Sequence, residues 1–169
     1  MTLPIVIGTA AYIVGAAALA SAQERGWVAE VTIGWAGFVD EVTENYPLVG
    51  GSFRRSLTPR ISIGPEFVIM PKSAAVRDRN LMLTGNVVFD AYPLVGADAR
   101  RVTPFFVGGV GIFWGRDQVR NGPFWFSDPA FTGGGGVRAQ LNERVSAAAE
   151  YRLGWELHQR VSAYAGIHW

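Results

Sequence analysis

The sequence contains no cysteine in 169 residues, so neither a disulfide framework nor thiol chemistry is available to it. Charge is also scarce: Asp, Glu, Lys and Arg make up 17% of the residues, against about a quarter in a typical soluble domain. The net charge is only +1, which removes the electrostatic basis for a nucleic-acid partner. With two histidines and no cysteine, we expect neither a protein metal site nor a cofactor.

The one long apolar run lies at the N-terminus, over residues 3–22. It ends in Ala20-Ser21-Ala22, the small-x-small pattern of a signal-peptidase site. We therefore predict a secretory signal peptide over residues 1–22, cleaved before Gln23, and one mature domain over residues 23–169. No Lys or Arg precedes the run, which leaves an uncleaved anchor or an upstream start open, because about 20 apolar residues span a bilayer.

What the sequence does contain is a strictly alternating C-terminus. Every second residue counted back from Trp169 is apolar, and the residues between them are mixed. The apolar row is Val161, Ala163, Ala165, Ile167 and Trp169, and the mixed row is Ser162, Tyr164, Gly166 and His168. Because a strand sends alternate side chains to opposite faces, this segment predicts a strand with one apolar face. Such a strand closes an outer-membrane barrel or, alternatively, a soluble sandwich.

Further alternating segments of about ten residues precede it, and none of the chain after Gln23 is long and apolar enough for a membrane helix. Only helices and closed barrels satisfy the backbone in lipid. The predicted strands cover residues 27–38, 48–56, 60–70, 80–92, 102–115, 130–141, 145–155 and 160–169. An even number of alternating strands predicts an all-β fold, an eight-stranded antiparallel up-and-down transmembrane β-barrel. Residues 102–115 are apolar on both faces, so the orientation of that strand stays open.

Two stretches resemble a known family. Residues 134–152, GGGVRAQLNERVSAAAEYR, are similar to a hairpin of the OmpA-like and opacity-porin-like barrel domains, and residues 103–111, TPFFVGGVG, resemble their glycine-rich strand. The resemblance implies a small barrel of the bacterial outer membrane, surrounded by outer-membrane lipids. It also implies that the barrel-assembly machinery recognises the C-terminal strand. It identifies a class of barrel and no particular activity.

The polar face of the predicted strands carries four acids and four bases. They are Glu30, Arg54, Arg60, Glu66, Asp90, Arg138, Glu150 and Arg152. The interior of an eight-stranded barrel is just wide enough for side chains to fill it. Because an unpaired buried charge is very costly, these groups predict a lumen plugged by Arg–carboxylate pairs, with Arg138 near Glu150. The alternative is that several lie at the wet rims.

Aromatic residues fall near strand ends or on the apolar face, where they would form the girdles at the two membrane interfaces. The predicted girdle is Trp27, Trp35, Trp114, Tyr151, Trp155 and Trp169. Three more aromatics, Phe124, Trp125 and Phe126, lie in a predicted outer loop over residues 116–129. They are candidates for binding a surface ligand, or they fold back onto the rim as additional girdle.

These observations favour a non-catalytic barrel with a structural, envelope-integrity or surface-binding role. One alternative is a lipid A-modifying barrel enzyme, for which His158 and Ser162 are the nearest candidates. On one strand these two residues would lie about 13 Å apart, too far for a base and its nucleophile. The other alternative is a soluble lipocalin-like carrier of a small apolar ligand.

Overall fold

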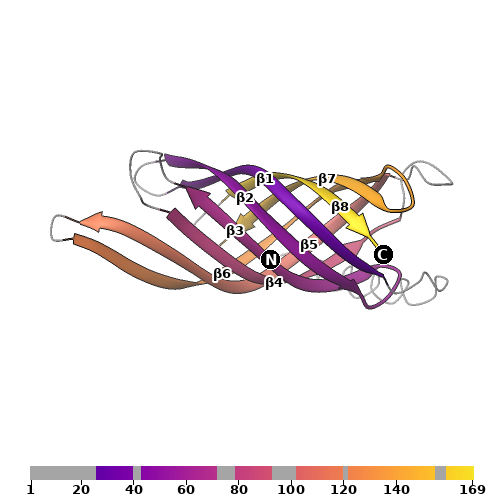
Figure 1. Cartoon of the computed structure of the whole chain (residues 1–169), viewed down its shortest axis with the longest axis horizontal. Helices are drawn as coiled ribbons and strands as arrows, with labels where there is room; N and C mark the ends of the chain where they lie inside the picture. The colour runs from indigo at the N-terminus through magenta and orange to yellow at the C-terminus, as the bar shows by residue number, and fades with distance from the viewer. Residues whose placement is uncertain (1–25, 40–42, 72–78, 93–101, 120–121, 155–158) are drawn as a thin grey trace, which may run out of the picture.

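The computed structural model describes residues 26–39, 43–71, 79–92, 102–119, 122–154 and 159–169. They form a closed barrel in which each strand pairs antiparallel with its neighbours in chain order and β8 pairs back with β1 (Figure 1). The strands are β1 (Trp27–Val39), β2 (Thr43–Ser56), β3 (Ile61–Pro71), β4 (Arg79–Asp90), β5 (Val102–Val119), β6 (Gly122–Gln140), β7 (Val145–Gly154) and β8 (Gln159–His168). The predicted eight-stranded antiparallel barrel is confirmed. Within the described part of the chain, no helix is long and apolar enough to cross a membrane.

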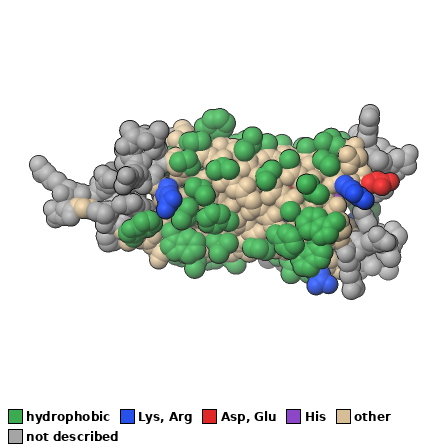
Figure 2. All heavy atoms as spheres, viewed as in Figure 1, with side chains coloured by type: hydrophobic (Ala, Val, Ile, Leu, Met, Phe, Trp, Pro, Cys, Tyr) green, Lys and Arg blue, Asp and Glu red, His purple; other side chains and the backbone are tan. Residues whose placement is uncertain are grey.

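The barrel is apolar outside and polar inside. In β1, Val31, Ile33 and Trp35 are each 65% exposed, whereas Glu30 and Thr32 between them are buried. Figure 2 shows hydrophobic side chains spread along the length of one face, with charged side chains at its two ends. A soluble protein buries its apolar strand face, so this inverted alternation is typical of a wall that faces lipid.

The two ends of the described chain close the barrel. The amide of Trp27 donates to the carbonyl of Trp169 at 2.8 Å, and the amide of Trp169 donates back to the carbonyl of Trp27 at 3.0 Å. Their side chains both contact Phe53, whose ring centroid lies 4.8 Å from that of Trp27 and 5.9 Å from that of Trp169. Trp169 therefore forms the last backbone hydrogen bonds between β8 and β1, and its side chain belongs to an aromatic cluster on the outer wall.

The orientation of β5, which the sequence left open, is decided by its neighbours. Phe105 and Val107 are buried inside, whereas Phe106 and Val110 are 60% exposed on the outer wall. Register places Phe105 opposite Asp90 and Val107 opposite Val88, and cross-strand partners share a face. The odd-numbered residues of β5 therefore face the lumen.

The prediction of an outer loop over residues 116–129 is wrong. β5 and β6 pair as far as Val119 and Gly122, so these residues form a two-stranded arm that projects beyond the other strands (Figure 1). Gly122 has a φ of 119°, a backbone conformation that glycine adopts at little cost and that suits the turn. The segment was predicted as a longer, polar connection between two strands. Its Pro123 and Pro129 do not prevent pairing with β5, because proline is tolerated at the edge of a sheet.

Candidate functional site: the barrel interior

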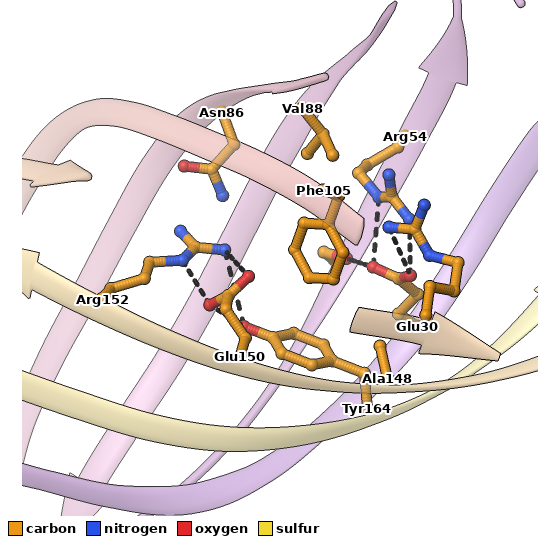
Figure 3. Close-up of a pocket in the computed structure, with 11 residues that line it drawn as sticks. Glu30, Arg54, Asn86, Val88, Phe105, Ala148, Glu150, Arg152 and Tyr164 are labelled. Carbon is orange, nitrogen blue, oxygen red and sulfur yellow. Dashed lines mark hydrogen bonds and ion pairs between the residues drawn. The ribbon is translucent and has the colours of Figure 1, made fainter. Parts of the chain in front are cut away.

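The inward-facing side chains fill the lumen in two polar clusters with an apolar contact between them (Figure 3). The first cluster, here the charge ring, consists of Glu66 from β3, Glu150 and Arg152 from β7, and Arg160 from β8. Acids and bases alternate around it. Arg160 Nη2 lies 2.8 Å from Glu66 Oε1 and 3.1 Å from Glu150 Oε1. Arg152 closes the ring, because its Nη1 is 2.9 Å from Glu66 Oε2 and its Nε pairs with Glu150 Oε1.

Two neutral side chains, those of Tyr164 and Asn86, form hydrogen bonds with the charge ring. The Tyr164 hydroxyl donates to Glu150 Oε1 at 2.7 Å and accepts from Arg160 Nη2 at 2.7 Å. The Asn86 amide donates to Glu66 Oε2 at 2.9 Å. Each carboxylate of the ring is thus paired with two guanidinium groups and receives an additional neutral hydrogen bond.

The second cluster, here the Glu30 cluster, lies toward the end of the barrel where Trp27 and Trp169 meet. Arg54 donates to Glu30 from Nε at 3.1 Å and from Nη2 at 2.5 Å, a bidentate pair. Arg138 pairs with Asp90 at 2.5 Å and lies 3.9 Å from Glu30, and its guanidinium stacks 4.8 Å from the centroid of the Phe105 ring.

Together the two clusters contain four carboxylates and four guanidinium groups, so the charges within these clusters balance. Glu66 and Arg160 are each only 1% exposed. Taking such groups out of water is compensated only when their geometry and hydrogen bonds are complete. This arrangement explains how so many charges are tolerated inside a small barrel.

Apolar side chains and buried neutral polar ones such as Thr32, Asn80 and Thr84 occupy the rest of the interior. One cluster caps the lumen at the end where the arm projects, and a second lies between the two charged clusters. The cap is formed by Ala36, Tyr46, Leu48, Val68, Met70, Met82 and Ala130 with Phe113 against it, and the second by Val88, Phe105 and Val107 with Ala148. The cavity beside Phe105, between the charged clusters, has room for about one water molecule. Around Phe105 the described side chains therefore leave little free space.

Several solved structures superpose on the chain, and transmembrane β-barrels are among them. The chain superposes on the N-terminal β-barrel domain of OprF from Pseudomonas aeruginosa with a TM-score of 0.62 and 12% identity, covering 84% of this chain and 97% of that one. For Neisserial surface protein A the TM-score is 0.64 at 9% identity, and the match covers 88% of this chain and 98% of that one. For Ail of Yersinia pestis the TM-score is 0.59 at 11% identity, and the match covers 87% of this chain and 100% of that one.

The chain has the fold of the small eight-stranded outer-membrane β-barrels. The resemblance noted in the sequence is confirmed at the level of the fold. No protein-family model matches the chain, and no curated protein matches it. At these identities the likeness concerns the fold, and the chemistry of this outer-membrane-type barrel has to be argued from its own residues.

The structure places seven of the eight predicted lumen charges inside the barrel. The eighth, Arg60, was wrongly predicted to lie there. Arg60 lies in the turn between β2 and β3, where its guanidinium stacks 3.5 Å from the centroid of the Tyr92 ring. Arg160 takes its place inside. The alternation of the C-terminal strand could have revealed this, because Arg160 is on the same face as Ser162 and Tyr164.

The predicted contact of Arg138 with Glu150 is also wrong. Register pairs Arg138 with Ala148 and Glu150 with Gly136 across β6 and β7. Arg138 reaches Asp90 of β4 instead, and Glu150 belongs to the charge ring. Neighbouring positions on a hairpin did not predict which charges meet inside, because in a narrow barrel long side chains also reach strands that are not adjacent in the sheet.

Most of the predicted girdle lies on the outer wall. Trp27, Trp35, Tyr151 and Trp169 are exposed there, and Trp114 is half-buried. Trp155 and His158 lie outside the described residues, as does the predicted signal peptide. Of the three loop candidates, Trp125 is exposed on the arm and Phe126 is half-buried against Phe113, with ring centroids 6.1 Å apart; the Phe124 side chain is outside the description.

Replacing Thr84 tests whether an ordered water lies beside its buried hydroxyl in the lumen. Thr84 is 1% exposed, it lies opposite Glu66 in register, and its hydroxyl has no hydrogen-bond partner within the described residues. We expect Thr84→Val, which exchanges the hydroxyl for a methyl of similar size, to raise the free energy of unfolding by about 1 kcal/mol, because a buried unsatisfied hydroxyl is removed. Urea titration in lipid vesicles measures this change. A loss of stability would instead show that the hydroxyl is held by an ordered water.

Proposed function

We propose that the protein is a non-catalytic barrel of the bacterial outer membrane with a structural, envelope-integrity role. The observation that carries this proposal is the combination of an apolar outer wall with an interior that is packed and charge-balanced. A structural barrel has to be stable in lipid and closed to ions, and the charge ring and the apolar cap provide the closure. Outer-membrane lipids are then its surroundings, and the closing strand is the segment that the barrel-assembly machinery recognises.

Two observations weigh against the alternatives. A carrier of a small apolar ligand needs a chamber of several hundred Å³, whereas the cavity between the charged clusters admits about one water molecule. An enzyme needs an accessible nucleophile and base. Ser146 does contact His168, with 2.8 Å between Oγ and Nε2, but Ser146 is only 2% exposed inside the barrel wall.

The membrane proposal is tested by electrophoresis and by recordings across planar bilayers. The protein should fractionate with outer membranes, run at a different apparent mass when it is not boiled, and show little steady conductance. Intact mass of the exported protein should correspond to a chain that begins at Gln23. A monodisperse monomer in detergent-free buffer would contradict the membrane role, and a large stable conductance would contradict the closed lumen.

Trp169→Ser should impair assembly far more than Trp125→Ser. Trp169 completes the β1–β8 ladder and contacts Phe53, whereas Trp125 lies on the arm, beyond the pairing of β6 with β7. The yield of the heat-modifiable form in outer membranes should fall several-fold in the first variant and stay near the unmutated level in the second. Equal yields would remove the role proposed for the closing strand.

A further inference from the structure

The outer wall carries a guanidinium group among apolar side chains. Arg55 of β2 is exposed, and so are Phe53 and Leu57, two residues to either side of it. Across the sheet, Arg55 lies opposite Trp27 of β1 and Ile63 of β3, which are exposed as well. Cross-strand partners share a face, so all four apolar neighbours surround this one cation on the outer wall. A charge in such surroundings is costly in hydrocarbon and calls for an anionic partner at the membrane interface.

Arg55 lies near one end of the barrel. It is the last residue but one of β2, at the end where Trp27 pairs with Trp169. The β5–β6 arm projects from the opposite end (Figure 1). In outer-membrane barrels the long segments lie on the outer side and the periplasmic side is short, so we infer that the end with Arg55 faces the periplasm. Figure 2 shows the cationic side chains of the visible face toward its two ends, where headgroups replace acyl chains.

Two guanidinium groups are held against aromatic rings at this end. Arg55 Cζ lies 5.3 Å from the centroid of the Trp27 ring. Arg60, at the other end of the β2–β3 turn, has its Cζ 3.5 Å from the centroid of the exposed Tyr92 ring. Stacking uses the flat face of a guanidinium, whereas its N–H donors lie in the plane of the group and match the oxygens of a phosphate. The rings therefore orient both cations for an anion without using their donors.

The charges of these two arginines are not offset by the described carboxylates. No described carboxylate forms an ion pair with Arg55 or Arg60, because the ion pairs of the described residues belong to the two lumen clusters. A zwitterionic phospholipid carries its own cation beside its phosphate, whereas an anionic phospholipid does not. Basic residues at a membrane surface accordingly attract anionic lipids.

We propose that the rim around the β2–β3 turn binds the phosphate of an anionic phospholipid in the periplasmic leaflet. The inference rests on the proposed outer-membrane location and adds a specific lipid partner to it. Arg55 and Arg60 donate hydrogen bonds to the phosphate oxygens, and Phe53 and Ile63 contact the upper part of the acyl chains. This rim patch consists of Trp27, Phe53, Arg55, Leu57, Arg60 and Ile63.

The test uses the full barrel in nanodiscs made of equal parts of phosphatidylglycerol and phosphatidylcholine with the same acyl chains. The lipids that stay bound when the barrel is released into detergent are counted by native mass spectrometry. We expect the unmutated protein to retain phosphatidylglycerol at least tenfold over phosphatidylcholine. Arg55→Gln and Arg60→Gln should each lower this ratio about fivefold, the contribution of one arginine near an anionic lipid surface.

Arg144 provides the matched control. It is exposed at the same end of the barrel, where its carbonyl accepts the amide of His168, but it lies beside Glu143 in the β6–β7 turn on the opposite wall. Arg144→Gln should leave the ratio of the two lipids within twofold of the unmutated value. An equal loss in this control and in Arg55→Gln would replace the rim patch by a general attraction to the whole positive rim, and so overturn the site.

The remaining outcomes separate this inference from the membrane proposal on which it rests. Equal retention of the two lipids by the unmutated protein, or an unchanged ratio in both patch variants, would overturn the phosphate site. Heat-modifiable mobility of every variant, measured in parallel, shows that it is folded and inserted. If the unmutated protein does not insert, the membrane proposal fails; if it inserts without preferring phosphatidylglycerol, only the rim inference fails.

Discussion

Glu150→Ala is expected to lower the free energy of unfolding by about 3–5 kcal/mol, the cost of removing one partner from a buried ion pair. Glu150 is 6% exposed and pairs with both Arg152 and Arg160. Its loss leaves the charge ring with two guanidinium groups and one carboxylate, and it removes the nearer of the two carboxylate acceptors of the Tyr164 hydroxyl. Urea unfolding in lipid vesicles, followed by tryptophan fluorescence, measures the change.

Second substitutions identify which arginine is left unpaired. Adding Arg152→Ala should restore part of the lost stability, because Glu66 and Arg160 then remain as a neutral pair. Adding Arg138→Ala should restore nothing, because Arg138 belongs to the Glu30 cluster. Glu143→Ala, an exposed residue of the β6–β7 turn, is the control and should change stability by less than about 0.5 kcal/mol. A stable Glu150→Ala barrel would show that the ring does not hold the interior together.

Gly111→Ala should destabilise the barrel by about 1–3 kcal/mol through overpacking, with a lower yield of folded protein. Gly111 faces the lumen from β5, and a Cβ there would strike the carbonyl of Leu83 and lie 2.7 Å from Thr84 Cα. Both contacts are with backbone, which moves far less readily than a side chain. Close approach of the strands at this point therefore requires glycine.

Gly108→Ala is the matched control on the same strand. Gly108 faces outward, and a Cβ there meets nothing within 4 Å. Its replacement should be neutral or slightly stabilising, because alanine restricts the unfolded chain more than glycine does. Unfolding curves of the two variants in the same vesicles make the comparison. Equal stability of both would show that the strands separate easily at Gly111, contrary to the packing described above.

The sequence alone was enough for the architecture, because period-two alternation is a local property of a strand. Seven of the predicted lumen charges follow from it, and Arg160 could have been found in the same way. Strand limits were less predictable. Pro123 and Pro129 indicate a loop when read locally, yet both lie on an edge of β6 where no described strand pairs, and the ladder with β5 tolerates them.

What the sequence by itself determined is which face each strand turns to lipid and therefore the kind of barrel that the chain forms. What only the tertiary structure decided is which charges meet: Glu66 and Arg160 are 94 residues apart in the chain, and Arg138 reaches Asp90 across 48. Such partners depend on the stagger of all eight strands and on how far a long side chain reaches across the lumen. Neither quantity is encoded near the residues concerned, because each arises only when the strands pair into the barrel.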